Sequence, residues 1–401
     1  MFFDVPILFA GLGSIILLGF LANYFFLKTR IPDVIWLVLL GILLGPLSHL
    51  IDQKLVMSYA PFFAALATVI ILFEGGINTD LLLLVKEFKN SVLIAVGNVI
   101  LSMIFCGIVM NKMFSWPLMY GMLLGVMIGG TSSPVIISMT KNLKIDEKTR
   151  TILNVESTLT DVLCFVLSMA LISVILEENT SLELVLNKIM SNFSVGAVIG
   201  FISGIFWLSI IKKVKGKFKY MITLGFTFLV YSFVEKIMAS GAIAVLTMGI
   251  VLGNSYEILK MLEAEKAFLI DRKIKEFHEE ITFLIKSFFF VYLGTIINLS
   301  NIFFVLLGFF LTLLLLTLRY IFSSIVLLKL NIPNYDKQIT KVLMGRGLAA
   351  AVLSQFPLFY NLEYAEWFPN TILLVIIFSI LFSSLGIMMA ERSRKKEKLE
   401  S

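Results

Sequence analysis

Long apolar runs follow one another along most of the 401-residue chain, and short polar stretches separate them. A helix that crosses about 30 Å of hydrocarbon needs about 20 such residues. The runs are continuous and do not alternate, so they predict helices and not the strands of a membrane barrel. We expect thirteen spans, over residues 6–27, 33–50, 59–76, 91–111, 117–139, 152–176, 192–211, 219–235, 237–254, 281–298, 302–328, 339–358 and 370–390.

Positive charges between the runs indicate an orientation. Most of the 33 Lys and Arg residues fall in alternate loops on one side, whereas Lys54, Lys112, Lys188 and Lys236 fall in the loops on the other side. By the positive-inside rule the N-terminus lies outside and the C-terminus in the cytoplasm of a cell membrane. The first run has no basic segment before it, so we expect no cleavable signal.

The odd number of spans predicts internal symmetry. A first repeat of six spans covers residues 1–176, a linking span lies in 177–218, and a second repeat covers 219–390. Because the repeats start seven spans apart, they run in opposite directions, as the inverted repeats of many transporters do. The fold class is therefore an all-α polytopic membrane protein. Within the second repeat, the charged segment 257–280 is expected as a cytoplasmic amphipathic helix, and 391–401 as a disordered cytoplasmic tail.

Helix-breaking residues occur in the fifth span of each repeat. One span contains Gly129-Gly130-Thr131-Ser132-Ser133-Pro134, and the other contains Gly345-Arg346-Gly347 and later Pro357. Proline cannot donate to the helical ladder, and broken helices line the substrate site of many transporters. The plainer alternative for the first stretch is a glycine-packed helix crossing with a proline kink.

Other glycines are spaced for packing. Gly196, Gly200 and Gly204 recur every fourth residue and predict a face that receives a neighbouring helix or a second subunit. The pairs Gly41/Gly45 and Gly121/Gly125 follow the same pattern.

Composition agrees with lipid as the solvent. Of the residues 59% are hydrophobic and 15% are charged, compared with about 25% charged in soluble domains. The net charge of +6 is spread over short loops, so no nucleic-acid partner is expected. Cys106 and Cys164 lie in apolar runs, without a disulfide framework or zinc spacing. Hydrolase and nucleotide-binding motifs are missing too, so we expect neither an enzyme nor a cofactor.

An ionisable side chain inside a span is expensive and marks a candidate site. Asp161 lies about 14 Å along its span, near the middle of the bilayer. Ser157 shares its helix face, whereas Glu156 points about 140° away. A carboxylate beside hydroxyls suits a small hard cation, and the alternative is a carboxylate that ties helices together. The expected Na⁺ ligands are Asp161, Ser157, Thr160, Thr131, Ser132 and Ser133.

Three basic residues also lie within spans. Arg346 is about 10 Å deep, and we expect it to pair with Glu156; snorkelling to the membrane edge is the alternative. Lys286 is five residues into its span, where snorkelling and a functional role are equally expected. Arg319 lies near a span end and is expected to snorkel.

Taken together, these motifs resemble the monovalent cation–proton antiporter superfamily, above all its archaeal and bacterial sodium–proton antiporters. The similarity covers nearly the whole chain. It includes the Phe73–Gly76 stretch (Phe-Glu-Gly-Gly), the broken fifth span and Gly345-Arg346-Gly347. The stretch from Glu156 to Asp161 is similar to the family's Glu-Ser-x-x-Asn-Asp motif.

The resemblance implies roles for individual residues. Asp161 corresponds to the carboxylate that binds cation and proton in turn, with Glu156 and Ser157 beside it. Arg346 and Lys286 correspond to the family's basic residues, and a homodimer is implied. Thr160 replaces the usual Asn or Asp, which leans towards electroneutral exchange. Ser132 and Ser133 replace the Thr-Asp before the family's proline, so one acidic ligand is missing.

Other functions stay open at this point. A K⁺/H⁺ antiporter or K⁺ efflux system of the same fold is the nearest alternative. A Na⁺-coupled solute symporter would need a larger polar cavity than these residues supply. A passive channel fits a single titratable acid at mid-membrane less well than alternating access does.

Overall fold

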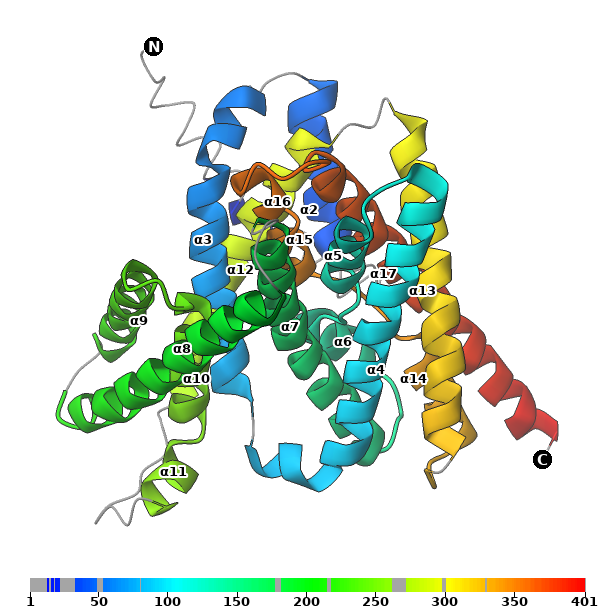
Figure 1. Ribbon diagram of the computed structural model, residues 1–401. Helices are drawn as coiled ribbons and strands as arrows, with labels where there is room; N and C mark the ends of the chain where they lie inside the picture. Colours follow the sequence, from blue (N-terminus) through cyan, green and yellow to red (C-terminus); the bar gives the residue numbers. More distant parts are fainter. Residues whose placement is uncertain are drawn as a thin grey trace. The chain divides into compact units, whose positions relative to one another are not determined.

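The computed structural model describes residues 33–48, 53–79, 81–176, 182–214, 218–261, 272–297, 301–328 and 330–400, together with a few positions between 13 and 21. These residues form helices and contain no strand, as expected (Figure 1). The predicted first span, 6–27, lies almost wholly outside the described residues. Each later predicted span overlaps a helix.

Six described helices are long and apolar enough to cross a membrane: α3 (Gln53–Asn78), α4 (Leu81–Phe114), α7 (Glu147–Leu176), α8 (Leu182–Ile211), α13 (Ile302–Leu328) and α17 (Trp367–Glu400). A seventh span would combine α10 (Gly241–Gly253) with α11 (Ser255–Met261), which meet at a bend of 83°. The remaining helices are shorter or more polar: α2 (Asp33–Ile42), the π-helical turn η1 (Leu43–Leu47), α5 (Leu118–Met127), α6 (Ser133–Thr140), α9 (Lys219–Lys236), α12 (Arg272–Ile296), α14 (Asn334–Val342), α15 (Leu348–Leu353) and α16 (Phe356–Phe359). The count of thirteen spans stays a prediction.

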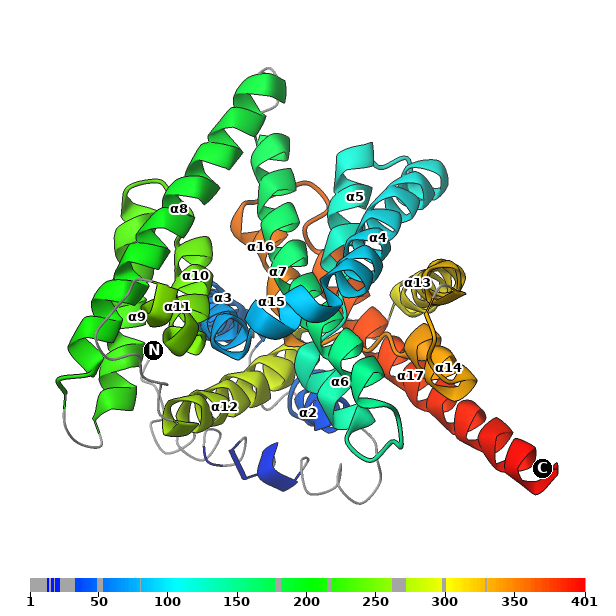
Figure 2. The same cartoon turned by 90° about the horizontal axis from the view of Figure 1, so that it is seen from below.

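The chain forms two compact units, each assembled from separate stretches of sequence. Unit 1 contains residues 1–64, 89–168 and 284–401, and unit 2 contains 65–88 and 169–283. Both predicted repeats contribute helices to each unit. In unit 1, α13, α14 and α17 pack side by side, which both ribbon views show (Figures 1 and 2).

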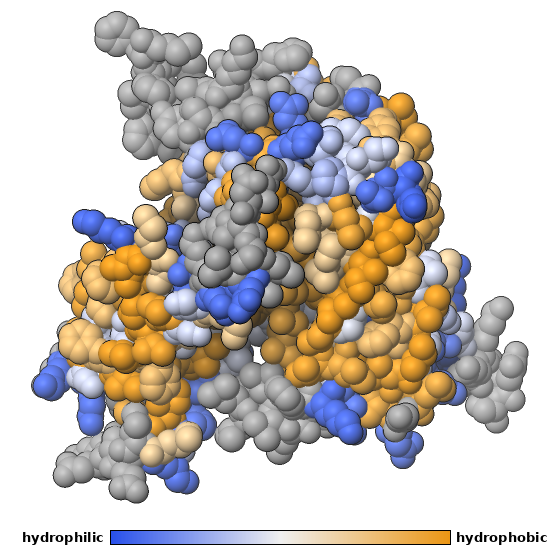
Figure 3. Space-filling model, in the orientation of Figure 1, coloured by the Kyte–Doolittle hydropathy of each residue, from blue (hydrophilic) through white to orange (hydrophobic). Residues whose placement is uncertain are grey.

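The surface of unit 1 is suited to lipid. Figure 3 shows hydrophobic residues over much of the face that α4 presents. Leu93, Ile100 and Ile108 of α4 are exposed, as are Leu306 and Ile325 of α13. Large exposed apolar surfaces of this kind are unusual in soluble monomers and ordinary in membrane helices.

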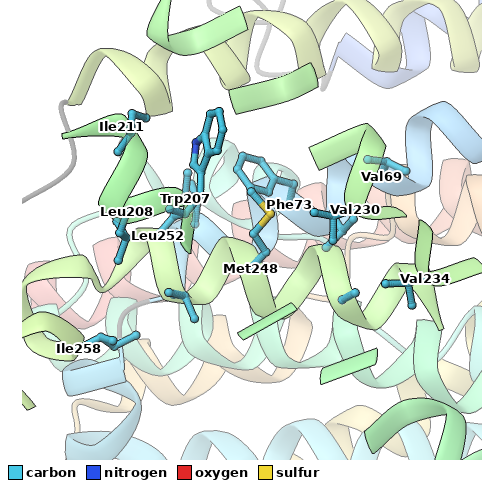
Figure 4. Packing of buried hydrophobic residues seen from close by; sticks show 14 of the residues in the cluster. Val69, Phe73, Trp207, Leu208, Ile211, Val230, Val234, Met248, Leu252 and Ile258 are labelled. Carbon is cyan, nitrogen blue, oxygen red and sulfur yellow. The ribbon is translucent and has the colours of Figure 1, made fainter. Parts of the chain in front are cut away.

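Unit 2 has an apolar core. Phe73 of α3, Trp207 of α8, Val230 of α9 and Met248 of α10 point into one buried cluster (Figure 4). The ring of Trp207 stacks on Phe226, with centroids 4.3 Å apart. Its indole nitrogen donates to Thr223 Oγ1 at 3.0 Å, so the buried N–H is satisfied.

The predicted glycine face packs a helix of the same chain. A Cβ at Gly196 would lie 2.5 Å from the Ser240 carbonyl oxygen, and one at Gly200 would overlap the Ala244 carbonyl oxygen. Since both contacts advance by four residues along each helix, α8 and α10 run parallel with their backbones in contact. These helices correspond to the seventh and ninth predicted spans, and two odd-numbered spans cross a membrane in the same direction.

The other two glycine pairs behave likewise in unit 1. Gly121 and Gly125 of α5 lie against Cys106 and Ser102 of α4, so these helices run antiparallel. Gly41 of α2 lies against Val291 and Gly294 of α12. Gly45 of η1 lies against Thr295, further along both segments, so these two segments run parallel. At these three pairs of helices, close backbone contacts therefore replace side-chain packing.

Two polar segments differ from the simple expectation. The expected surface helix 257–280 is described only at its two ends: residues 257–261 close α11, residues 272–280 begin α12, which continues to Ile296, and 262–271 lie outside the described residues. Its role as a cytoplasmic amphipathic segment stays a prediction. The tail from Glu391 is not disordered: α17 continues as a helix to Glu400, because its charged residues are good helix formers.

Candidate functional site

Two interrupted helices meet in unit 1, at the helix-breaking residues that the sequence indicated. The first break, residues 128–132, separates α5 from α6, and the second, residues 343–347, separates α14 from α15. The backbone N–H of Ser132 donates to the Gly345 carbonyl oxygen at 2.9 Å. A Cβ at Gly347 would overlap Ser132 Oγ, so only glycine allows this approach. We call these two stretches the crossing.

Arg346 lies inside the crossing and is only 3% exposed. Its guanidinium donates to the Ile128 carbonyl oxygen at 2.7 Å, to that of Gly129 at 3.5 Å, and to that of Met344. These carbonyls end α5 and α14, where helices leave acceptors unpaired and carry partial negative charge. Arg346 therefore neutralises two helix C-termini with one fixed charge.

The predicted ion pair between Arg346 and Glu156 is wrong, because Arg319 takes that place. Two guanidinium nitrogens of Arg319 donate to the two Glu156 carboxylate oxygens, one of them at 3.0 Å. Arg319 also donates to the Thr340 carbonyl oxygen at 3.0 and 3.2 Å. The pair is buried, with Arg319 3% and Glu156 1% exposed. It joins α13, α7 and α14.

The prediction that Arg319 snorkels fails for the same reason. Depth along a span does not say which face of the helix a residue occupies. The side chains of Thr312, Leu315, Arg319 and Ser323 are buried along one stripe of α13, while Leu313 and Tyr320 are exposed. Two hydroxyl residues on the stripe of Arg319 were the available signal for a polar interior.

Asp161 lies on α7 and is partly exposed. Its Oδ2 accepts a hydrogen bond from Ser133 Oγ at 3.4 Å. Ser133 Oγ is also 3.3 Å from Thr158 Oγ1. Ser133 begins α6 directly after the break, so the carboxylate stands at a helix N-terminus, where partial positive charge favours an anion. Sequence reasoning missed Thr158, although its i, i+3 spacing to Asp161 places it on the same face.

The crossing is thus charged in a complementary way. The fixed cation, Arg346, lies at the negative ends of α5 and α14. The carboxylate of Asp161 lies at the positive end of α6. Hydroxyls of Ser133 and Thr158 add hard oxygen atoms beside it. This combination can hold a small monovalent cation and can equally hold a proton.

Thr160 supports the unwound chain. Its Oγ1 accepts from the Thr131 backbone N–H at 3.0 Å and lies 3.1 Å from the Thr131 carbonyl oxygen and 3.0 Å from that of Ser157. One hydroxyl thus replaces ladder contacts that Thr131 loses at the break. Thr131 Oγ1 is 3.4 Å from Thr160 Oγ1, so these two predicted ligands lie against each other.

The remaining predicted residues are placed as follows. Ser157 is fully buried and donates to the Asn154 carbonyl oxygen of its own helix at 2.9 Å. Ser132 lies against Gly347. Lys286 forms an ion pair with Asp33, which connects α12 to the start of α2. Of the predicted ligand set, Ser133 is the residue that the described contacts join to Asp161.

Known proteins share this architecture. The solved structure of the sodium proton antiporter MjNhaP1 from Methanocaldococcus jannaschii superposes with a TM-score of 0.80 at 21% sequence identity, covering 96% of this chain and 98% of that one. At that identity the similarity establishes the fold alone.

Sequence relatives point in the same direction. The K(+)/H(+) antiporter NhaP2 of Shewanella baltica is 23% identical over 386 residues, which is 92% of this chain. The K(+)/H(+) antiporter NhaP of Alkalimonas amylolytica is 22% identical over 346 residues, which is 83% of this chain. The chain spans 64% and 57% of the lengths of these two relatives.

The model of the family described as "Sodium/hydrogen exchanger, transmembrane" matches residues 13–390. The match includes both breaks, the buried Arg319–Glu156 pair and Asp161. Family, fold and crossing agree with the sequence motifs. The chain is a multi-pass membrane protein that belongs to the transmembrane sodium/hydrogen exchanger family, a family of transporters and not of enzymes.

Proposed function

We propose that the chain is a secondary active antiporter that exchanges Na⁺ or Li⁺ for H⁺, with Asp161 binding the two in turn. The supporting observation is the hydrogen bond from Ser133 Oγ to Asp161 Oδ2, at the N-terminus of a helix that begins inside the crossing. It places a carboxylate beside an interrupted helix, and the ion sites of many transporters lie at such interruptions. The exchange needs no cofactor.

One carboxylate serves for two ions because either of them neutralises it. A form loaded with a proton or a cation carries no net charge at Asp161. The empty form would carry an unpaired charge through a low dielectric, which costs several kcal/mol. If only the loaded forms of the protein switch between facing outside and facing inside, each ion carried inward requires the other ion to be carried outward.

Charge counting favours electroneutral exchange. Thr160 stands beside Asp161 where a second acid would be needed for a two-proton cycle, and its hydroxyl carries no charge. Arg346, Glu156 and Arg319 hold the helices in place with fixed charges. One H⁺ per cation then moves no net charge. Transport by proteoliposomes should not respond to an imposed membrane potential, and a clear voltage dependence would contradict this stoichiometry.

K⁺/H⁺ exchange is the second candidate, because the relatives from Shewanella baltica and Alkalimonas amylolytica carry that name. The choice of Na⁺ or Li⁺ rests on the few oxygen atoms beside Asp161, which suit a small ion better than a large one. Titration with Na⁺, Li⁺ and K⁺ on one preparation separates the candidates. If the apparent KM is lower for K⁺ than for Na⁺, the proposed substrate becomes K⁺.

The wider arrangement is proposed with the function. Two inverted repeats carry the two breaks, the N-terminus lies outside the cell membrane, and the active form is a homodimer. Accessibility of single cysteines placed at Arg392 and at Leu118 tests the orientation. Labelling of the Arg392 position from outside intact cells would overturn it.

The test of the function is Asp161→Asn in proteoliposomes. This substitution keeps the shape of the side chain and removes its charge, so cation-dependent proton movement should fall to background. Glu147→Gln is the matched control, because Glu147 is an exposed carboxylate on the same helix. Full activity of Asp161→Asn would remove the proposal. Uptake of an organic solute with Na⁺ by the wild type would favour a symporter.

A further inference from the structure

The far end of α17, at the close of the last predicted span, packs against both broken helices. Ile387 and Ala390 of α17 share a buried cluster with Ile136 of α6 and with Tyr335 and Ile339 of α14. Here α6 runs away from the crossing and α14 runs towards it. The cluster therefore joins the ends of two half-helices whose other ends meet at the crossing.

Arg394 bridges three elements at this end. Its guanidinium carbon lies 4.4 Å from the ring centroid of Tyr335, in the first turn of α14. One of its terminal nitrogens donates to the Lys144 carbonyl oxygen, in the segment between α6 and α7, at 2.8 Å. A cation over an aromatic face is attracted by the ring quadrupole, and the planar guanidinium can make both contacts at once.

A second hydrogen bond connects the start of α14 to the segment between α6 and α7. The Asp336 carboxylate accepts from the Asp146 backbone N–H at 2.9 Å, and Asp336 is 2% exposed. Burial is the main cause that raises the pKa of Tyr335; the Glu391 carboxylate adds to the rise, and Arg394 opposes it through its charge and a hydrogen bond to the phenol. The phenol therefore stays neutral at physiological pH, so its ring and not a phenolate faces Arg394.

Both ends of α6 and α14 are consequently fixed to each other. At the crossing, Ser132 N–H donates to the Gly345 carbonyl oxygen. About one helix length away, Arg394 and Asp336 join the start of α14 to the segment that follows α6. A shift of α14 along its axis would move Gly345, and with it the first turn of α6, which carries Ser133.

We propose that Arg394 is a positioning residue: by holding Tyr335 and the Lys144 carbonyl it fixes α14 against α6 and so keeps Ser133 beside Asp161. This inference rests on the proposed antiport function for its transport readout. Arg394 touches neither ion. Its loss should therefore weaken cation binding at the crossing without removing the carboxylate that performs the exchange.

The transport test compares four single variants and one double variant in proteoliposomes. Arg394→Gln should raise the apparent KM for Na⁺ about 3- to 10-fold, the size of a moderate cation–π contact, with a nearly unchanged maximal rate. Tyr335→Leu should give the same shift, and the double variant should be no worse than either. Arg394→Lys should recover part of the affinity, because an ammonium can still face the ring. Tyr335→Phe keeps the ring and loses only the hydroxyl, so its KM should shift less than that of Tyr335→Leu.

Arg392→Gln is the matched control. Arg392 is exposed on the same helix, and the substitution removes the same charge. An equal KM shift in this control would overturn the proposal. An unchanged KM for Arg394→Gln would also overturn it. This holds even if the variant gives a lower yield of folded protein, because a lower yield alone shows only a loss of stability.

A second measurement does not depend on transport. Hydrogen exchange of the solubilised full chain should be faster in α14 and around Asp146 for Arg394→Gln, and unchanged for Arg392→Gln. If the wild type moves no monovalent cation but this exchange pattern appears, the antiport function fails while the positioning contact stands. Equal exchange in all variants would refute the contact itself.

Discussion

Both units pack helices through glycine contacts and apolar clusters, but unit 1 adds buried charge. At and beside its crossing, unit 1 buries Arg346, Arg319 and Glu156, each at most 3% exposed. Unit 2 packs α8 directly on α10 through Gly196 and Gly200 and fills the rest with an apolar core. Charges are thus concentrated where the helices are interrupted.

The difference follows from the backbone. A continuous helix satisfies its own N–H and C=O groups, so its neighbours need only fit closely. An interrupted helix leaves carbonyls without partners in a medium that offers no water. Arg346 serves those carbonyls at two helix ends, and Thr160 serves Thr131. Irregular backbone and buried charge therefore occur together, and the same irregular backbone is what can hold an ion.

The largest effect on stability should come from breaking the buried pair. Arg319→Met leaves the Glu156 carboxylate, 1% exposed, without its cation, which should cost about 3–5 kcal/mol. Thermal unfolding of the purified protein measures it. The double variant Arg319→Met with Glu156→Leu should recover most of the loss, because an apolar pair of similar volume is often neutral. A double variant as unstable as the single one would contradict this reading.

A somewhat smaller effect is expected at the crossing itself. Arg346→Met leaves the Ile128 carbonyl oxygen, the best-placed acceptor, unpaired, which should cost about 1–3 kcal/mol for each buried acceptor lost. Transport should fall with it. Arg346→Lys should recover part of both, because an ammonium keeps the charge but not the planar set of donors. A fully active, fully stable Arg346→Met would show that the helix ends need no fixed cation.

These two residues also show how far the sequence leads. The paired breaks and the place of Asp161 follow from glycines, a proline and one costly acid, which are local signals. The partners of Arg319 and Arg346 do not. Both arginines lie at plausible depths for Glu156, and the choice depends on how α13 and α14 are rotated against α7. Rotation is set by packing between segments more than 150 residues apart in sequence, which periodicity cannot supply.

A contact in unit 2 should be sensitive to bulk and not to charge. Gly200→Val would overlap the Ala244 carbonyl oxygen and force α8 away from α10, at a cost of about 1–3 kcal/mol. Gly225→Ala is the matched control, because no atom lies within 4 Å of the added Cβ, and it should stabilise α9 slightly. Melting temperatures compare them. Equal melting of Gly200→Val and wild type would refute the close contact.

The tail shows a different limit of sequence reasoning. Glu391 to Glu400 reads as a charged terminus, and its composition alone predicts disorder. The same residues are good helix formers, so α17 continues through them. Arg394 also contacts the Tyr335 ring and the Lys144 carbonyl, which are distant in sequence and could not be predicted from composition.

The last effect is absent at neutral pH and appears only as the pH falls; it concerns unit 2. His278 lies in the charged first part of α12, before predicted span 281–298, with its ring 4.7 Å from that of Phe73. Burial lowers its pKa to about 4, from about 6.5 in an unfolded chain. Between these values the unfolded state binds a proton that the folded state does not. Stability is therefore complete above about pH 6.5 and is lost as the pH falls towards 4.

His278→Phe keeps an aromatic ring against Phe73 and removes this titration. As the pH is lowered from 7 to 4.5, its free energy of unfolding should rise relative to that of the wild type by up to about 1.4 kcal/mol per pH unit. The difference in melting temperature between the two proteins measures this rise. The same pH dependence in both proteins would show that His278 reaches water when charged.

The central claim is that one carboxylate at the crossing holds either a cation or a proton. The most direct measurement is the apparent KM for Na⁺ in proteoliposomes at a series of pH values. Competition for Asp161 predicts that KM rises about tenfold for each unit of falling pH on the acid side, while the maximal rate at saturating Na⁺ stays constant. A KM that does not change with pH, together with a maximal rate that falls, would contradict a shared site.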